Sequence, residues 1–353
     1  MAVTKPIVNV DGITQAAKTY DPVLRALPYV TLNEGAAILK LNIQEVDNEH
    51  VLTNVRRQAG STGPYTPGMT INYKEEMAKF FETSLKPVLV VSKTKDNITK
   101  YTDKKVLTLG GKQVDNKSKT HPLEKLIVMN EIISHSEDVL YSLFFAERDN
   151  AVFSPMTAFD GFYTKLDVFT VAGLISTANK NLENTGAFAV PTVETDYTAY
   201  EKLVDWIGSS NSLLRSSKGG APLLTLSETV IKAARAAFRF KLKQHAYPTT
   251  QELLESLRED AFCPGLTFNT HEALGTGSKL MLHKPNMFDI GFNTQSAAQF
   301  CQVRNIYEDP NDIQFWIQSA YDTRIQDIHP KVFKTNEQSN TALNLAGDYV
   351  VAE

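Results

Sequence analysis

Cysteine is nearly absent from this chain, with only Cys263 and Cys301 among 353 residues. Two thiols are too few for the disulfide framework of a small secreted protein. The first ten residues, MAVTKPIVNV, also lack the charged start and apolar stretch of a secretory signal. We therefore expect a chain that is made and kept in a reducing cytoplasm.

Long apolar runs are missing, and the net charge is small. No stretch reaches the roughly 18 consecutive apolar residues that indicate a transmembrane helix. The 36 basic and 40 acidic residues give a formal net charge of −4, which excludes the chain-wide basic field of many nucleic-acid-binding proteins. Hydrophobic residues make up 42% of the chain, as in globular proteins with a buried core.

The local signatures of enzymes are missing as well. The chain contains no phosphate-binding loop, no HExxH, no GxSxG and no paired CxxC. No two of its seven histidines lie three or four residues apart, the spacing that places two metal ligands on one helix face. We predict no catalytic residue, no metal site and no cofactor, and we expect a binding or structural role.

The N-terminal segment is apolar without a helical or strand pattern. Residues 1–35 carry apolar side chains such as Ile7, Val8 and Val23, and prolines at 22 and 28 interrupt them. A proline disfavours helix at the residue before it. Such a segment needs a burial site, either on its own domain or on another subunit, and we predict an N-terminal arm.

Basic residues are concentrated in the part of the chain that follows. Residues 51–119 hold 13 basic and six acidic side chains, a balance of 13 − 6 = +7, which leaves −4 − 7 = −11 for the rest. Alternating apolar residues predict a half-buried strand over 36–46. Residues 88–109 are typical of a long hairpin with a charged tip, closed by Gly110-Gly111. Opposite charges on a projection and a body favour head-to-tail contact between copies; lysines are also typical of an exposed edge kept soluble.

Helices and short strands are expected in the rest of the chain. The longest helix is predicted over 121–147, where Thr120 is the cap and Pro122 lies in the first turn. Capping patterns predict further helices from Thr198, from Ser227 to about residue 244, and from Thr249. The helix after Ser227 is basic with two phenylalanines, a pattern found in nucleic-acid contacts and, more often, on solvated helix faces. Strands are predicted at 222–226, 279–283, 299–306 and 313–320, before an extended tail over 336–353.

Three stretches carry a family resemblance. The first runs from Arg56 to Gly68 and contains Gly-Pro-Tyr-Thr-Pro-Gly; the second is LTLS at 224–227 before a helix, together with KLMLHKPNMFDIG at 279–291; the third is FWIQSAYDTRI at 315–325. With the order of arm, basic hairpin, long helix, mixed region and return strands, they resemble the major capsid proteins of tailed bacteriophages, which have the Hong Kong 97-type fold.

The resemblance implies an α+β Hong Kong 97-like fold with five parts. These are an N-terminal arm (1–35), an extended β-hairpin region with peripheral strands (36–119), a spine helix with a peripheral domain (120–190), a central axial domain (191–298), and return strands with a C-terminal tail (299–353).

The resemblance also implies a function. The chain would form hexamers and pentamers of an icosahedral shell around double-stranded DNA, which it would contact non-specifically. It would assemble in the bacterial cytoplasm, reside in the virion, use portal and scaffolding or decoration proteins as partners, and involve no membrane. The inter-subunit contacts predicted on this basis are Arg56, Arg57, Tyr65, Lys93 and Lys100.

Other interpretations stay open at this point. Self-crosslinking capsid proteins join a loop lysine to an asparagine of a neighbour, but no feature selects among Lys93, Lys95 and Lys100, and we predict no crosslink. An encapsulin-like nanocompartment has a similar fold and encloses enzymes. A tail or baseplate subunit would form rings or tubes, and a cytoplasmic enzyme would be a small compact oligomer.

Overall fold

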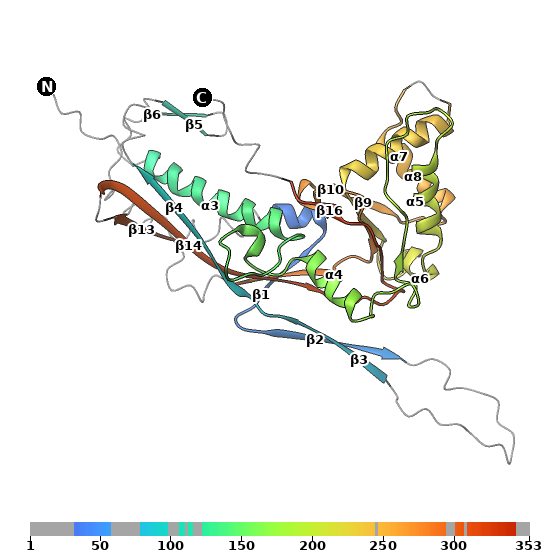
Figure 1. Cartoon of the computed structure of the whole chain (residues 1–353), viewed down its shortest axis with the longest axis horizontal. Coiled ribbons are helices and arrows are strands. Elements are labelled where there is room, and N and C mark those ends of the chain that lie inside the picture. The colour runs from blue at the N-terminus through green and yellow to red at the C-terminus, as the bar shows by residue number, and fades with distance from the viewer. Residues whose placement is uncertain are drawn as a thin grey trace, which may run out of the picture.

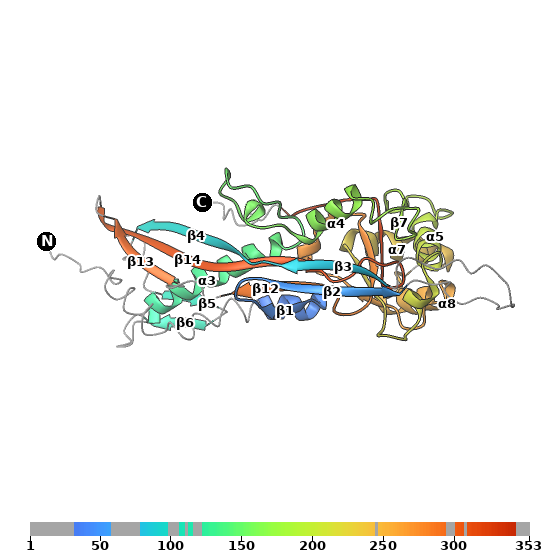
Figure 2. The ribbon, with the colours of Figure 1, turned by 90° about the horizontal axis from the view of Figure 1, so that it is seen from below.

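An elongated body, a projecting β-hairpin and a helical lobe make up the molecule (Figure 1). The structure is a computed structural model that describes residues 32–57, 78–97, 106–109, 112–115, 122–243, 246–293, 301–306 and 309–343. Figure 2 shows the longest strands running side by side to one end of the body, with the lobe at the other end.

A five-stranded sheet organises the body. Its order is β1 (Asn42–Glu45), β12 (Phe288–Asn293), β14 (Asp309–Ile325) and β13 (Cys301–Ile306), and β4 (Val88–Asn97) also pairs with β14. The two ends of β14 pair with β12 and β13 along one edge, whereas β4 runs antiparallel along the other edge. Within the described residues, β14 is the one partner strand of β4.

The prediction of a hairpin over residues 88–109 is wrong. β4 pairs with β14, whereas β5 (Val106–Leu109) pairs with β6 (Lys112–Asp115) across Gly110-Gly111. The projecting hairpin instead consists of β2 (His50–Arg57) and β3 (Ala78–Leu85), which pair over eight residues each. The glycine pair marks a local turn in the sequence, but the partner of a core strand depends on packing between distant segments.

The strand expected over 36–46 is also wrong in its first half. Residues 32–39 are helical, and β1 begins only at Asn42. Leu32, Ala36 and Leu39 lie at helical spacing and are fully buried. They share a core with α3 (Pro122–Ser142). A short run of apolar residues can fit both the strand period and the helix period. Here, packing of Leu32, Ala36 and Leu39 against α3 favours the helix.

The predicted long helix is confirmed as α3, which ends at Ser142. Its 21 residues make it about 32 Å long. With α4 (Phe162–Val171), the helix 32–39 and the large sheet, it surrounds the first hydrophobic core.

A second core lies in the lobe. The core is formed by α5 (Thr198–Gly208), α7 (Glu228–Lys241) and α8 (Thr250–Asp260), packed against a second sheet. The order of that sheet is β7 (Leu182–Glu183), β15 (Phe333–Asn336), β11 (Leu280–His283), β8 (Leu223–Leu226) and β9 (Thr267–Asn269). The remaining short elements are η2 (Pro155–Thr157), α6 (Ser212–Arg215), η3 (Glu272–Leu274), β10 (Thr276–Gly277) and β16 (Asn340–Thr341).

Of the four predicted helix caps, one is confirmed, and Thr120 lies outside the described residues. Thr249 and Glu252 form a reciprocal capping box at the start of α8. Ser227 precedes α7, but its hydroxyl donates to the carbonyl of Gly277 at 2.6 Å and does not cap the helix. Thr198 is the first residue of α5 and not its cap. The cap position is Tyr197, which makes no side-chain capping bond, and Asp196 accepts the backbone N–H of Thr198 at 3.0 Å.

Candidate assembly surfaces

The β2–β3 hairpin has an apolar outer face. Side chains alternate between the two faces of a hairpin, and the outward set includes Val51, Val55 and Phe80. Val55 is 64% exposed and Phe80 is 67% exposed, and the two are direct cross-strand partners. No described residue covers them, so the outer face is free to pack against another molecule.

The inner face of the same hairpin is fixed to the body. The ring of Phe81 lies 5.9 Å from that of Phe169 on α4. Leu85 is fully buried against β12, where only a glycine leaves room: a Cβ at Gly291 would lie 2.7 Å from Leu85 Cγ. Because this face is occupied within its own chain, only the outer face can serve an assembly contact.

A buried ion pair holds the root of the hairpin. The Arg324 guanidinium pairs with Asp289, to which Nε donates at 2.8 Å and Nη2 also donates. Nη1 donates to His50 Nδ1 at 3.0 Å and to the His50 carbonyl at 3.1 Å, at the first residue of β2. Nη2 reaches Gln44 Oε1 at 3.1 Å. One buried cation thus joins β14, β12, β1 and the start of the hairpin.

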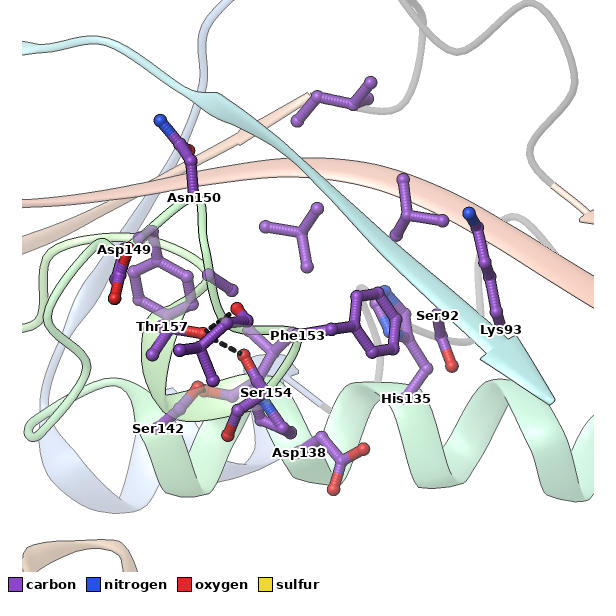
Figure 3. A pocket seen from close by; sticks show the side chains of 18 of the residues that line it. Ser92, Lys93, His135, Asp138, Ser142, Asp149, Asn150, Phe153, Ser154 and Thr157 are labelled. Carbon is purple, nitrogen blue, oxygen red and sulfur yellow. Dashed lines mark hydrogen bonds between the residues drawn. The ribbon is translucent and has the colours of Figure 1, made fainter.

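A groove of about 580 Å³ lies along β4 (Figure 3). Its walls are β4, the α3 residues His135, Asp138, Val139 and Ser142, and the loop 149–159. His135 Nε2 lies 2.8 Å from Ser319 Oγ, and burial lowers the pKa of His135 to about 4, so this imidazole is neutral near pH 7. Burial also raises the pKa of Asp138.

Metal-binding and membrane-spanning features were sought in the same residues. Within the described part of the chain, no three His, Cys, Asp or Glu side chains cluster in a way that would hold a metal ion. None of the helices described is both long and apolar enough to cross a bilayer. Burial raises the pKa of the Cys263 thiol to about 11, as expected for a core cysteine.

Solved structures with this arrangement of elements include a phage procapsid. A chain of the satellite phage P4 procapsid, which includes a size determination (Sid) protein, matches with a TM-score of 0.51 at 11% identity, over 88% of this chain and 89% of that one. The chain has the Hong Kong 97-type capsid fold. The expected α+β fold is therefore confirmed.

Two further shells match less closely. The capsid of the native GTA particle matches with a TM-score of 0.49 at 11% identity, over 87% of this chain and 90% of that one. The capsid of Myoviridae phage XM1 matches with a TM-score of 0.48 at 8% identity, over 86% and 90% of the two chains. No family profile and no curated protein sequence matches the chain.

The residues predicted to contact other subunits lie on different elements of the structure. Arg56 and Arg57 end β2, in register with Lys79 and Ala78 at the open end of the projecting hairpin. Lys93 lies on β4, with its ammonium 4.1 Å from the centre of the Trp316 ring. Tyr65 and Lys100 lie outside the described residues.

Sequence reasoning missed the apolar outer face of the hairpin. The signal is the pairing of HVLTNVRR with AKFFETSL, both of which carry apolar residues on each face. A strand with two apolar faces does not reveal which face its own chain covers. The strand register and the contact of Phe81 with α4 show that Val55 and Phe80 lie on the outer face.

Proposed function

We propose that this chain is the major capsid protein of a tailed bacteriophage, the repeated subunit of an icosahedral shell around double-stranded DNA. Hexamers and pentamers of the chain would tile the shell, since head-to-tail contacts close into rings. The protein would assemble in the bacterial cytoplasm and reside in the virion, with portal and scaffolding or decoration proteins as partners.

One observation carries this proposal: a hairpin with an uncovered apolar face projects from a body that has a procapsid subunit's fold. Burying a large apolar side chain contributes about 1.5–3 kcal/mol. Several such side chains per subunit, repeated over every contact, favour association into a closed shell. A specific interface usually buries more than about 1,000 Å², so the hairpin would act together with other surfaces.

The charge distribution supports head-to-tail contact. The region with the hairpin carries +7, against −11 for the rest of the chain, and Arg56 and Arg57 lie where the hairpin reaches farthest among described residues. Opposite fields orient association more than they strengthen it. A net charge of −4 also suits a wall that touches DNA without binding it tightly.

The two cores follow the proposed division of the chain in part, because Ala273, Leu274 and the β12 residues of the proposed axial domain belong to the first core. Residues of the proposed axial domain, 191–298, make up most of the second core, and α3 with α4 belongs to the first. The boundaries at 35, 119, 190 and 298 stay proposals.

Electron microscopy of the purified chain tests the function. We expect icosahedral shells from the unaltered protein and soluble, folded subunits without shells from Val55→Asp/Phe80→Asp. The matched control, Val55→Ile/Phe80→Leu, keeps the face apolar and should form shells.

The alternatives give different results in the same experiment. Tubes or open rings would indicate a tail or baseplate part, and shells that hold an enzyme in place of DNA in the host would indicate a nanocompartment. A stable monomer at high concentration would rule out the proposal.

A further inference from the structure

α7 in the lobe is the helix whose basic and aromatic residues match two patterns in the sequence, a nucleic-acid contact and a solvated face. The structure assigns several of these residues to other tasks. Phe238 is buried in the second core. Lys241 pairs with Asp260 on α8 at 2.9 Å, and Lys232 pairs with Glu228 one turn earlier at 3.2 Å. These residues have their partners within the lobe.

Three basic residues of α7 and its C-terminal turn have no carboxylate partner among the described residues. They are Arg235, Arg239 and Lys243, at positions i, i+4 and i+8, and we call them the basic row. Arg235 and Arg239 lie one helical turn apart, about 6 Å, on one face of α7, and Lys243 follows the C-cap Leu242 and is exposed. Arg235 Nε donates to the carbonyl of Pro248 at 2.9 Å, which orients the side chain without neutralising it. The row is therefore a strip of uncompensated positive charge.

Aromatic rings hold the middle member of the row. The central guanidinium carbon of Arg239 lies 4.6 Å from the centre of the Phe240 ring and 4.3 Å from that of the Tyr247 ring, both within the range of a cation–π contact. Its Nε is buried and has no hydrogen-bond partner among the described residues. A guanidinium held in this way keeps its charge and its fork of N–H donors, which matches the oxygens of a phosphate.

The other helices of the lobe expose carboxylates. α8 exposes Glu252, Glu255 and Glu259, and α5 exposes Glu201 and Asp205. A face that only needs solvation usually mixes the two signs along its length, whereas this lobe keeps its unpaired cations together on one helix. A uniformly positive strip favours a ligand with repeated negative charges, because each charge that it neutralises releases counterions.

We propose that the basic row of α7 binds the phosphate backbone of DNA without reading its sequence. The inference rests on the proposed shell function and names the surface with which a subunit would touch the enclosed duplex. α7 contains no Asn, Gln or Ser, side chains that often contact base edges, so its cations are suited to phosphates. The rings of Phe240 and Tyr247 are engaged by Arg239, which favours a charged ligand over an apolar protein surface.

Duplex binding by the full-length, unassembled chain tests the proposal. Fluorescence anisotropy of a labelled 20-base-pair duplex of random sequence gives the affinity between 50 and 200 mM salt. Three phosphate contacts give a slope of roughly −3 for the logarithm of affinity against the logarithm of salt concentration. Arg235→Gln/Arg239→Gln/Lys243→Gln should weaken binding at 50 mM salt by at least about tenfold and should flatten the slope by about 3.

A matched control removes the same charge elsewhere. Lys180, Lys218 and Lys331 are exposed and lie outside α7, so Lys180→Gln/Lys218→Gln/Lys331→Gln should bind the duplex with the affinity and slope of the parent. Equal losses in the two triple variants would mean that only net charge matters and would overturn the proposal. Circular dichroism checks the fold; should the row variant misfold, Lys243→Gln alone should flatten the slope by about 1.

The remaining outcomes also decide. A row variant that binds the duplex like the parent overturns the proposal, and if the same variant no longer assembles, the row is a contact between subunits. Microscopy of the same samples reads the shell separately. Shells with duplex binding that does not depend on the row reject only the row, and row-dependent binding by a parent chain that forms no shell rejects only the shell.

Discussion

Arg324 is a buried charge satisfied from several strands at once. It is 2% exposed, and its partner Asp289 is fully buried and also accepts hydrogen bonds from Asn42 at 3.0 Å and Gln326 at 2.7 Å. Such a pair adds little net stability when complete, because desolvation offsets the attraction, but removing one member leaves an uncompensated charge. The arrangement therefore specifies geometry at the hairpin root more than it adds stability.

Asp289→Ala should lower the free energy of unfolding by about 3–5 kcal/mol, because Arg324 would keep its charge without a counterion. Urea unfolding of the unassembled subunit measures this. Lys232→Ala breaks an exposed i,i+4 pair with Glu228 and should cost less than about 1 kcal/mol. Equal effects of the two variants would contradict the role of the buried pair.

Two buried histidines make the fold sensitive to acid. Burial lowers the pKa values of His135 and His283 from 6.5 to about 4. His283 Nδ1 donates to the Lys284 carbonyl, so Nε2 accepts from the Thr225 hydroxyl, both at 2.8 Å. Between pH 6.5 and 4 the unfolded chain binds protons that the folded chain does not, so stability is full above pH 6.5 and falls as the pH is lowered toward 4.

His283→Gln should flatten that dependence. Each histidine contributes a loss of up to roughly 3 kcal/mol over this range, and glutamine does not titrate. The free energy of unfolding of the subunit, measured between pH 7.5 and 4.5, should fall less steeply in the variant. Parallel curves for variant and parent would show that His283 titrates alike in both states.

At the scale of elements, the sequence predicts what local contacts decide. The start of α8 follows from Thr249 and Glu252, and β8 and β11 follow from short apolar runs between turn residues. The prediction of a hairpin over 88–109 was wrong because β4 pairs with β14, which is distant in the sequence. Among the proposed contacts, the family resemblance pointed to Arg56 and Arg57, but only the register reveals the Val55–Phe80 pair.

Gly291 is the element-scale constraint on the hairpin. Gly291→Ala should destabilise the subunit by about 1–3 kcal/mol through overpacking, because its Cβ would lie 2.7 Å from Leu85 Cγ. In Gly291→Ala/Leu85→Ala the clash is gone, so the two losses should not add. Thermal unfolding of the single and double variants gives the coupling. Strictly additive losses would mean that the two residues do not share this space.

At the scale of the whole molecule, opposite charges lie on different parts of the chain. The +7 region includes the hairpin, and the remaining −11 is spread over the body and lobe. Exposed charges interact weakly and are screened by salt. Their proposed role is thus to orient each subunit as it joins.

Arg56→Glu/Arg57→Glu should leave the subunit folded and block shell formation. The reversed charges would meet an acidic neighbour at the far end of the described hairpin, where like charges repel. Circular dichroism reports the fold and light scattering reports assembly. The conservative variant Arg56→Lys/Arg57→Lys should assemble. Normal shells from the reversed variant would remove the hairpin arginines from the interface.

In the proposed shell, the length of β14 has a mechanical consequence. Its 17 residues form one unbroken strand, and ten of them pair with β4. Tension from contents under pressure, directed along this strand, would load its cross-strand bonds in shear, so that they share the force and yield together. Tension perpendicular to the strand would break these hydrogen bonds one after another. The wall would then be strongest along the line of its longest strand.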